Sequence, residues 1–481
     1  MSIDPQLLWS STWDTLYMVF AASVASVFLG LCLGLLLYVS ARDGVWANKH
    51  LYRALSFIVN VGRSIPFVIL MIALIPITRF LVGTSIGTNA SIIPLTVAAI
   101  PFYARIAESA FKQVPQGLLE AAKAMGLTPW QTIIKVVVPE SKVILLEGAT
   151  LTVIALIAYS SIVGMIGGGG LGDVAIRYGY QRFDLIMMFA TIVILVVLVQ
   201  FVQWLGDLSA KKRSVLFWGL LSIPLLLGSV AHEFYNSESA ASNTLTVGIV
   251  GGPMEQVLQV AQQVAEKQYG VKLKVVVFND YVLPNQALNN GDIDANIFQH
   301  QPYLDTQSKA HGYKISALTK TFVYPLGFYS IKIKSLNQLP DGGIVAVPND
   351  PSNEGRALNL LATTGIIKLT PGIGLFPTPQ NIIANPKHLK FKELDAADVP
   401  RALQDVSMGA ITNDYITVAH FTVNQALIHE GPNVPYANIV AVQTSRLTDS
   451  KLQALIPIMH SPEVLKETQA LFPNGAAIPA W

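Results

Sequence analysis

The chain has 481 residues, of which 52% are hydrophobic and only 13% charged, and its formal net charge is +2. This length exceeds what one hydrophobic core holds and predicts two or three domains. The nearly balanced charge, without a basic stripe interleaved with aromatic residues, excludes nucleic acid as an expected partner. The single cysteine, Cys32, excludes an intramolecular disulfide and a cysteine metal site.

Six apolar stretches in the first half are long enough to cross a bilayer, which requires about 20 residues per helix. Prolines and charged residues interrupt the third stretch, but a helix packed among other helices tolerates them. The stretches span residues 16–38, 55–77, 92–110, 143–166, 185–205 and 215–231. The first half is therefore predicted to be a polytopic, all-α membrane domain, in agreement with a mean hydropathy of +0.48 for the chain.

Lysine and arginine residues gather after the first, third and fifth stretches, whereas the alternate loops hold few of them. Positive residues mark the cytoplasmic side of a membrane protein, so the amino terminus is predicted to lie outside. The sixth stretch would then carry the rest of the chain back to the outer face. Two other interpretations of residues 215–231 stay open: a buried core helix, or an internal secretory signal cleaved near Ala231.

The cytoplasmic loop at residues 111–140, FKQVPQGLLEAAKAMGLTPWQTIIKVVVPE, predicts a hairpin of two short helices. Pro115 suits a first helical turn, and Gly126 can adopt the left-handed conformation that ends a helix. Thr128 then caps the second helix and Pro129 begins it, and this helix is expected to end near Pro139. One face of the hairpin is apolar and needs a partner. Leu118, Leu119, Ala122 and Met125 form this face.

The spacing of Glu120-Ala121-Ala122, Gly126 and Pro139 resembles the EAA loop of ABC importer permeases. The resemblance implies a coupling helix that docks on a dimer of ATP-hydrolysing subunits through Glu120, Ala121, Ala122 and Gly126. It also implies that a second copy of the chain completes the pore. The chain has no G-x-x-x-x-G-K-[ST] loop to cradle a nucleotide. No cofactor is therefore expected in this chain, and ATP and Mg are expected on the partner ATPase.

Other parts of the first half are less specific. Residues 61–87, VGRSIPFVILMIALIPITRFLVGTSIG, resemble the methionine-uptake branch of these permeases. The glycine run at residues 167–172 lacks a lysine and is expected to form a tight loop outside the bilayer. Glu147, near the inner end of the fourth stretch, is either interfacial or faces the translocation path.

From Thr244 onward, β-rich apolar segments alternate with helical ones, which predicts an α/β domain with parallel or mixed sheets. Residues 244–481 suffice for two lobes with a ligand cleft between them. Arg356 is placed in the first turn of a predicted helix after Asn353. There its guanidinium and the free helix amides could together hold a carboxylate. His300 has no second histidine or cysteine at ligand spacing, so a metal site is not expected.

Five segments of this half together resemble the methionine-binding lipoprotein family: FNDYVLPN, NIFQHQPYLD, VPNDPSNEGRAL, ITNDY and VPYANIV. In that family such segments form the ligand pocket. The resemblance implies an aromatic wall around a thioether chain, made by Tyr281, Phe298, His300 and Tyr303. It further implies that Asn353 and Arg356 hold the ligand carboxylate, and that Asn413 and Asn438 complete the polar contacts. Family members carry a lipid-modified cysteine, whose place the sixth stretch is expected to take here.

The sequence therefore predicts three regions: a permease domain at residues 1–210, a sixth span with a flexible tether at 211–243, and a two-lobed binding domain at 244–481. The expected function is that of a non-enzymatic subunit of an ATP-driven methionine importer in the bacterial inner membrane, with its receptor on the outer face. Selectivity between the L and D forms is left open. The alternatives are a ligand-gated sensor, an importer of another small amino acid or dipeptide, and a tethered enzyme. The enzyme is disfavoured because the pocket motifs contain no nucleophile–base pair or paired carboxylates.

Overall fold

The computed structural model describes residues 4–42, 44, 46–164, 168–181, 184–212, 243–416, 419–473 and 476–481. The chain divides into two compact units, Met1–Gly179 with Asp184–Glu238 and Tyr180–Phe183 with Ser239–Trp481. Each unit is described by itself. The predicted sixth span at residues 215–231 lies outside the described residues, and the predicted domain limits at 210 and 243 stay predictions.

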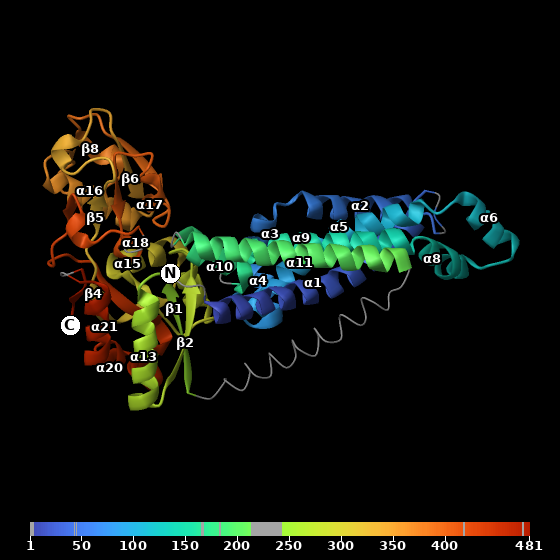
Figure 1. The fold of residues 1–481 in the computed structure, drawn as a ribbon, viewed down its shortest axis with the longest axis horizontal. Coiled ribbons are helices and arrows are strands. Elements are labelled where there is room, and N and C mark those ends of the chain that lie inside the picture. Colours follow the sequence, from blue (N-terminus) through green and yellow to red (C-terminus); the bar gives the residue numbers. More distant parts are fainter. Residues whose placement is uncertain are drawn as a thin grey trace. The chain divides into compact units, whose positions relative to one another are not determined.

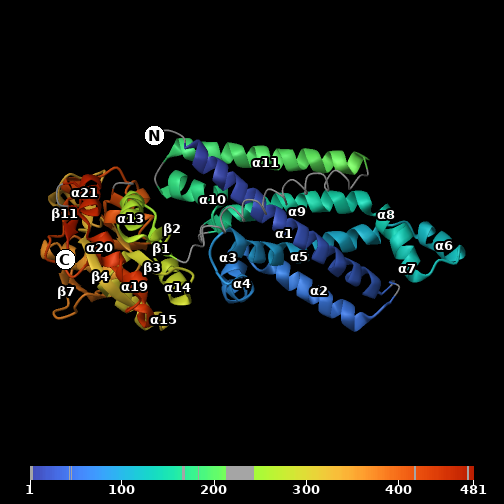
Figure 2. The same ribbon diagram turned by 90° about the horizontal axis from the view of Figure 1, so that it is seen from below.

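The described part of the first unit is helical (Figures 1 and 2). Among the described residues, four helices are long and apolar enough to cross a membrane: α1, α5, α9 and α11. The helices are α1 (Pro5–Ser40), α2 (Lys49–Ser64), α3 (Phe67–Ala73), α4 (Ile75–Val82), α5 (Thr88–Lys112), α6 (Gln116–Ala124), α7 (Pro129–Thr132), the π-helix η1 (Ile133–Val137), α8 (Val138–Glu140), α9 (Lys142–Val163), α10 (Gly170–Val174), the π-helix η3 (Ala175–Gln181) and α11 (Leu185–Lys212).

The second predicted span, at residues 55–77, is not one helix. It is broken between α2 and α3, whose axes differ by 105°. Ile65 has extended backbone angles (φ −80°, ψ 122°), and Pro66 is the cap of α3. Proline disfavours the helical conformation in the residue before it and has no amide hydrogen to donate. This bent pair is the fifth candidate span if α2 and α3 count as one crossing.

Helices α1 and α5 pack closely because α1 presents glycines to α5. A Cβ added at Gly34 would lie 2.6 Å from the carbonyl oxygen of Ala104, and one at Gly30 would lie 3.0 Å from that of Ile100. Small residues spaced four apart allow two membrane helices to approach backbone to backbone. Any larger side chain at Gly34 would therefore push the two helices apart.

The buried carboxylate within the third predicted span is paired with two cations of the same helix. Glu108 on α5 is buried and accepts hydrogen bonds from Arg105 at 2.5 Å and from Lys112 at 2.6 Å. Tyr52 of α2 donates to the same carboxylate at 3.1 Å. A charged group away from water is tolerated when it is paired and hydrogen-bonded. The network also fastens the broken span to α5.

The glycine-rich segment predicted as a tight outer loop is in part a buried helix. Residues 165–167 lie outside the described residues, but Gly170–Val174 form α10 and every one of its residues is buried. The backbone amide of Leu171 donates to Thr15 Oγ1 of α1 at 2.8 Å. A buried backbone must satisfy its polar groups, and this contact contributes to that at the start of the helix.

The second unit contains two mixed sheets, as predicted. A six-stranded sheet has the order β13-β4-β12-β3-β1-β2, and a five-stranded sheet has the order β11-β5-β10-β6-β9. The strands are β1 (Thr244–Val250), β2 (Lys272–Phe278), β3 (Ala295–His300), β4 (Ile315–Val323), β5 (Gly327–Tyr329), β6 (Ile344–Pro348), β7 (Lys368–Leu369), β8 (Ile382–Ala384), β9 (Lys390–Leu394), β10 (Met408–Ile411), β11 (Ile428–His429), β12 (Ala437–Gln443) and β13 (Ile478–Pro479).

The helices of this unit place apolar side chains against the sheets. In α13 the buried residues recur at helical spacing, so one face packs against the larger sheet. The helices are α13 (Met254–Tyr269), α14 (Leu283–Asn290), α15 (Gln301–His311), α16 (Pro351–Thr363), α17 (Val399–Ala402), α18 (Asn413–Ile416), α19 (Ser450–Gln453), α20 (Leu455–Met459) and α21 (Pro462–Leu471), with 3-10 turns at Leu336–Gln338, Pro379–Asn381, Val423–Gln425 and Thr444–Arg446.

The chain passes twice between the two sheets. Lobe A contains the six-stranded sheet (residues 244–323 and 437–481), and lobe B contains the five-stranded sheet (residues 327–429). We call residues 324–326 and 430–436, which connect them, the crossover segments. Ligands of two-lobed α/β domains bind in the crevice between the lobes, near strand ends.

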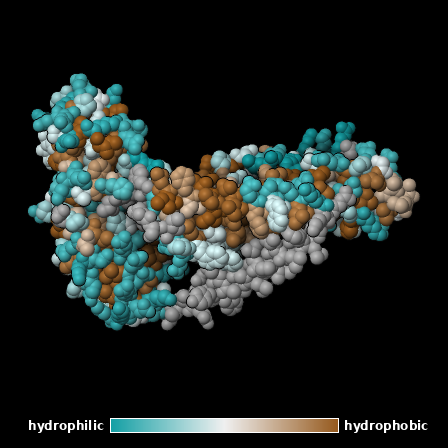
Figure 3. All heavy atoms as spheres, in the orientation of Figure 1, coloured by the Kyte–Doolittle hydropathy of each residue, from teal (hydrophilic) through white to brown (hydrophobic). Residues whose placement is uncertain are grey.

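The surfaces of the two units differ in hydropathy. Apolar residues dominate the visible face of the long helices in the first unit, whereas the second unit is largely hydrophilic outside (Figure 3). Large apolar side chains of this unit, such as Phe57 on α2, Phe80 on α4 and Phe189 on α11, are exposed. Such a surface is stable in hydrocarbon and not in water.

Candidate functional site

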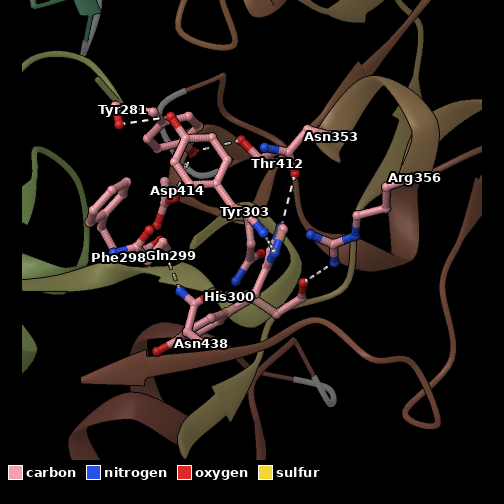
Figure 4. Close-up of a pocket in the computed structure, with 12 residues that line it drawn as sticks. Tyr281, Phe298, Gln299, His300, Tyr303, Asn353, Arg356, Thr412, Asp414 and Asn438 are labelled. Carbon is pink, nitrogen blue, oxygen red and sulfur yellow. Dashed lines mark hydrogen bonds between the residues drawn. The ribbon is translucent and has the colours of Figure 1, made fainter. Parts of the chain in front are cut away.

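The structure brings all eight residues predicted to bind the ligand to one cavity between lobes A and B (Figure 4). In Figure 4 Tyr281 and Phe298 lie on one side of this cavity, and Arg356 and Asn353 lie on the other. The eight residues are Tyr281, Phe298, His300, Tyr303, Asn353, Arg356, Asn413 and Asn438. Their contact with a ligand stays a prediction, but their convergence from separate segments is a property of the fold.

One wall of the cavity is aromatic. The ring centroids of Tyr281 and Phe298 are 5.7 Å apart, and Tyr303 meets both rings edge-on at 6.0 and 5.9 Å. The hydroxyl of Tyr303 donates to the carbonyl oxygen of Tyr281 at 2.8 Å and so fixes its own ring. The three rings pack against one another and make this wall of the cavity largely apolar.

His300 is held as a neutral ring. Its Nδ1 accepts the backbone amide of Tyr303 at 3.3 Å, so the proton lies on Nε2, which donates to Asn353 Oδ1 at 3.3 Å. Burial, together with the nearby Arg356, lowers the pKa of His300 to about 3. His300 therefore belongs to lobe A as an uncharged donor and bonds to lobe B through Asn353.

Arg356 lies in the second turn of α16, not in the first turn as predicted. The helix begins at Pro351, because Asp350 is its cap and accepts the backbone amide of Asn353 at 2.8 Å. Asn353 also donates from Nδ2 to Asp350 at 2.9 Å. The backbone amide of Asn353 is thus already bonded to Asp350 and is not free for a ligand. Of the predicted carboxylate site, made of free helix amides and the guanidinium, only the guanidinium of Arg356 is retained.

Arg356 forms a buried ion pair with Glu430 that the sequence did not predict. Its Nε donates to the two Glu430 oxygens at 2.8 and 2.9 Å, and its Nη2 donates to Glu430 Oε2 at 2.5 Å. Nη2 also donates to the carbonyl oxygen of Tyr324 at 2.7 Å, and Glu430 accepts the amide of Leu326 at 2.9 Å. The pair therefore joins α16 to both crossover segments. Among the described residues, no hydrogen bond occupies Nη1 of Arg356.

The two predicted asparagines are fixed by backbone contacts. Asn438 donates from Nδ2 to the carbonyl oxygen of Phe298 at 3.2 Å, and Asn413 donates to that of Ala476 at 3.2 Å. Asn438 lies at an irregularity in the pairing of β12 with β3. A bulge redirects side chains relative to a regular strand. These contacts fix the orientation of both side-chain amides.

The cavity is also lined by four residues that the sequence analysis did not select as ligand-binding residues: Gln299, Tyr324, Thr412 and Asp414. Asp414 Oδ2 accepts the hydroxyl of Tyr281 at 2.7 Å, and Thr412 Oγ1 lies 3.1 Å from that hydroxyl. These contacts connect lobe A with lobe B. Burial raises the pKa of Asp414 to about 6, although the Tyr281 bond and Arg356 oppose the shift. A signal was present, because Asp414 belongs to the same ITNDY segment as Asn413.

The predicted coupling residues lie in a hairpin that extends beyond the ends of the long helices (Figures 1 and 2). Glu120, Ala121 and Gly126 are exposed, and Ala122 is buried. Gly126 has a left-handed φ of +75°, as predicted. Pro115 is the cap of α6 and not part of its first turn. The large apolar side chains that the hairpin exposes are Leu118, Met125, Trp130 and Ile134.

The cap of the second hairpin helix is also as predicted. Thr128 accepts the backbone amide of Gln131, and the Gln131 side chain accepts that of Thr128, which is a complete capping box. The second arm passes through the π-helix η1 and ends at Glu140, beside Pro139. An ordered hairpin with an exposed apolar face has the properties of a docking element.

Comparison with known proteins finds a match for each unit. Residues 245–481 match the NlpA lipoprotein family, and residues 26–215 match the family described as binding-protein-dependent transport system inner membrane component. A "D-methionine-binding lipoprotein MetQ" of Salmonella typhimurium is 43% identical over 263 residues, which cover 54% of this chain and 97% of the relative. A "Probable D-methionine transport system permease protein MetI" of Vibrio cholerae is 49% identical over 211 residues, covering 44% of this chain and 94% of the relative.

Among solved structures, a nutrient binding protein of Burkholderia cenocepacia bound to methionine is 46% identical. The alignment covers 49% of this chain and 100% of that one, with a TM-score of 0.48.

Replacement of Glu430 by glutamine should destabilise the second unit, because it leaves the buried guanidinium of Arg356 without a counter-charge. We expect a loss of about 3–5 kcal/mol in the free energy of unfolding, measured by denaturant titration of residues 244–481. The control is Asp449→Asn, whose ion pair with Arg446 is about one-third exposed. It should lose less than about 1 kcal/mol. Equal losses would contradict a structural role for the buried pair.

Proposed function

We propose that the chain is a subunit of a methionine importer that combines the receptor and the pore. It belongs to the NlpA lipoprotein family over residues 245–481. Over residues 26–215 it belongs to the family of binding-protein-dependent transport system inner membrane components. The observation that carries this proposal is the convergence of an aromatic wall and a buried arginine on one cavity. The helical unit supplies the multi-pass inner-membrane part. The receptor and the pathway thus share one polypeptide.

Methionine is the proposed ligand because relatives named for methionine binding and methionine transport match the two halves separately. The cavity supports this choice chemically. The rings of Tyr281, Phe298 and Tyr303 offer an apolar wall, and Arg356 retains an Nη1 donor for a carboxylate. An Arg–carboxylate contact is charge-assisted and stronger than a neutral hydrogen bond.

The energy for uptake is proposed to come from a separate ATPase dimer that binds ATP and Mg and docks on the hairpin. Glu120, Ala121 and Gly126 are exposed there beside the apolar side chains Met125 and Trp130. An apolar patch exposed to the cytoplasm favours a protein partner. The hairpin is continuous with α9 through η1 and α8, which provides a path for motion to reach the membrane helices.

A second copy of the chain is proposed to complete the pore. Polar residues Asn60, Arg63 and Ser64 are exposed on α2, within the bent candidate span. Polar side chains in a membrane segment avoid lipid and face other helices or water. A second copy or an aqueous path between two copies would cover them.

The receptor is proposed to lie on the outer face of the membrane. The charge distribution of the loops supports this arrangement, provided that residues 215–231 cross the bilayer. A tether would then hold the receptor at high local concentration near the pore.

Ligand identity can be tested by calorimetry of residues 244–481 against L-methionine, D-methionine, a methionine dipeptide and other small amino acids. We expect methionine to bind most tightly, and Arg356→Ala to lose about 2–5 kcal/mol of binding free energy. Because alanine leaves Glu430 unpaired, the matched control is the double variant Arg356→Met, Glu430→Met, which removes both charges. It should fold and still bind methionine poorly. Tighter binding of another compound in the panel would contradict methionine as the ligand.

Coupling to an ATPase can be tested at Gly126. Its φ of +75° makes any side chain strained by about 1–2 kcal/mol, although a Cβ there would meet no atom within 4 Å. We expect Gly126→Val to reduce the ATP-hydrolysing activity that copurifies with the chain. Gly83→Val is the matched control, because Gly83 has a φ of +84°, equally open surroundings and a position outside the hairpin. An equal effect of both variants would argue against docking at the hairpin.

Sidedness can be tested with single cysteines in a Cys32→Ala background. Lys309 of lobe A and Lys123 of the hairpin are both exposed. A membrane-impermeant maleimide applied to intact spheroplasts should label Lys309→Cys and should label Lys123→Cys only after permeabilisation. If neither cysteine is labelled in intact spheroplasts and both are labelled after permeabilisation, the receptor lies in the cytoplasm. That result would contradict the proposed import function.

A further inference from the structure

The cavity between the lobes contains one anionic side chain, Asp414, that forms no ion pair with any of the described residues. Arg356 and Asp414 are the only charged residues that line the cavity in the described part of the chain. The charge of Arg356 is already balanced by Glu430, which lies behind it and is bonded to Nε and Nη2. The remaining charge at the cavity surface is therefore the negative charge of Asp414.

Asp414 is placed to receive a donor from the cavity. Its Oδ2 is occupied by the hydroxyl of Tyr281 at 2.7 Å. No hydrogen bond to its Oδ1 is found within the described ranges, and the side chain is only partly exposed. The labelled side chains of Figure 4 place Asp414 beside Tyr281 and away from Arg356. The cavity thus offers a cationic donor near one end and an anionic acceptor near the other.

We propose that Asp414 binds the ammonium group of the ligand and selects amino acids over carboxylic acids that lack an amine. This inference rests on the proposed function, that the cavity takes an α-amino acid. A zwitterion would place its carboxylate on Nη1 of Arg356 and its ammonium on Oδ1 of Asp414. A ligand with only a carboxylate would leave the buried Asp414 charge unpaired, which is costly.

The position of Asp414 also connects ligand binding with the contact between the lobes. Tyr281 comes from lobe A and Asp414 from lobe B, and the hydrogen bond between them joins the two lobes. An ammonium group on Oδ1 would keep the carboxylate ionised, and an ionised carboxylate is the stronger acceptor for the Tyr281 hydroxyl. The ligand would thereby strengthen the bond that holds the two lobes together.

The test uses calorimetry on the full chain in detergent, with two ligands: L-methionine and 4-(methylthio)butanoic acid, which is methionine without its amine. Asp414→Asn should bind methionine about 10–100 times more weakly at pH 7.5, the range for a charged hydrogen bond. It should bind the deaminated acid at least as tightly as the unmodified chain does. Asp405→Asn, an exposed aspartate of the same lobe, is the control and should leave both affinities unchanged.

Comparison of the two ligands distinguishes binding of the ligand ammonium by Asp414 from a structural role of Asp414 in holding Tyr281. If Asp414 served only to hold Tyr281, the substitution would weaken both ligands by the same factor, and that outcome overturns the proposal. Unchanged methionine binding by Asp414→Asn overturns it as well, while leaving the proposed function intact. Failure of the unmodified chain to bind methionine or any other amino acid overturns both.

A pH series on the unmodified chain keeps the proposal testable if Asp414→Asn does not fold. Asp414 becomes protonated as the pH falls through about 6, so methionine affinity should fall between pH 7.5 and 5. The deaminated acid should not weaken. Around Asp414, burial raises the pKa of Tyr281, Tyr324 and Tyr415, so all three stay protonated over this range, and His300, with a pKa of about 3, stays neutral. Parallel pH profiles for the two ligands would overturn the proposal.

Discussion

The buried ion pair of Arg356 and Glu430 is the interaction on which the receptor unit depends. It fastens α16 of lobe B to both crossover segments, through the carbonyl of Tyr324 and the amide of Leu326. A guanidinium this far from water would be unstable without its carboxylate. The same pair fixes what the cavity can do, because it occupies Nε and Nη2 and leaves Nη1 for a ligand. Placement of the lobes and the proposed recognition of a carboxylate therefore share one side chain.

Further polar contacts span the cavity from lobe A to lobe B. Tyr281 donates to Asp414, and neutral His300 donates to Asn353. A ligand between the lobes can touch both partners of each contact. A ligand with higher affinity for the arrangement in which both contacts are formed would shift the lobes toward that arrangement.

In the helical unit the governing constraint is the solvent. The bilayer offers no hydrogen bonds, so charges and irregular backbone persist only where the protein supplies partners. Glu108 is matched by Arg105 and Lys112 on its own helix, which explains how a span with these residues is tolerated. Outside the bilayer the constraint is relaxed. The hairpin of α6 and α7, proposed to lie there, leaves large apolar side chains exposed.

The sequence by itself determined the change from membrane helices to an α/β unit, because hydrophobic runs and strand–helix alternation are local properties of the chain. It also identified the segments that line the cavity. Only the tertiary structure decided the rest. The bend at Pro66, the buried α10 and the position of Arg356 in the second turn depend on which backbone groups find partners in three dimensions. Glu430 lies outside the pocket motifs, and its importance comes from burial beside Arg356, which a lone carboxylate in a loop does not reveal in the sequence. Asp414 lies inside one of the motifs, but only its contact with Tyr281 in the folded chain sets it apart from its neighbours. The charge balance of the cavity is set by distances between residues far apart in sequence, and those distances exist only in the folded chain.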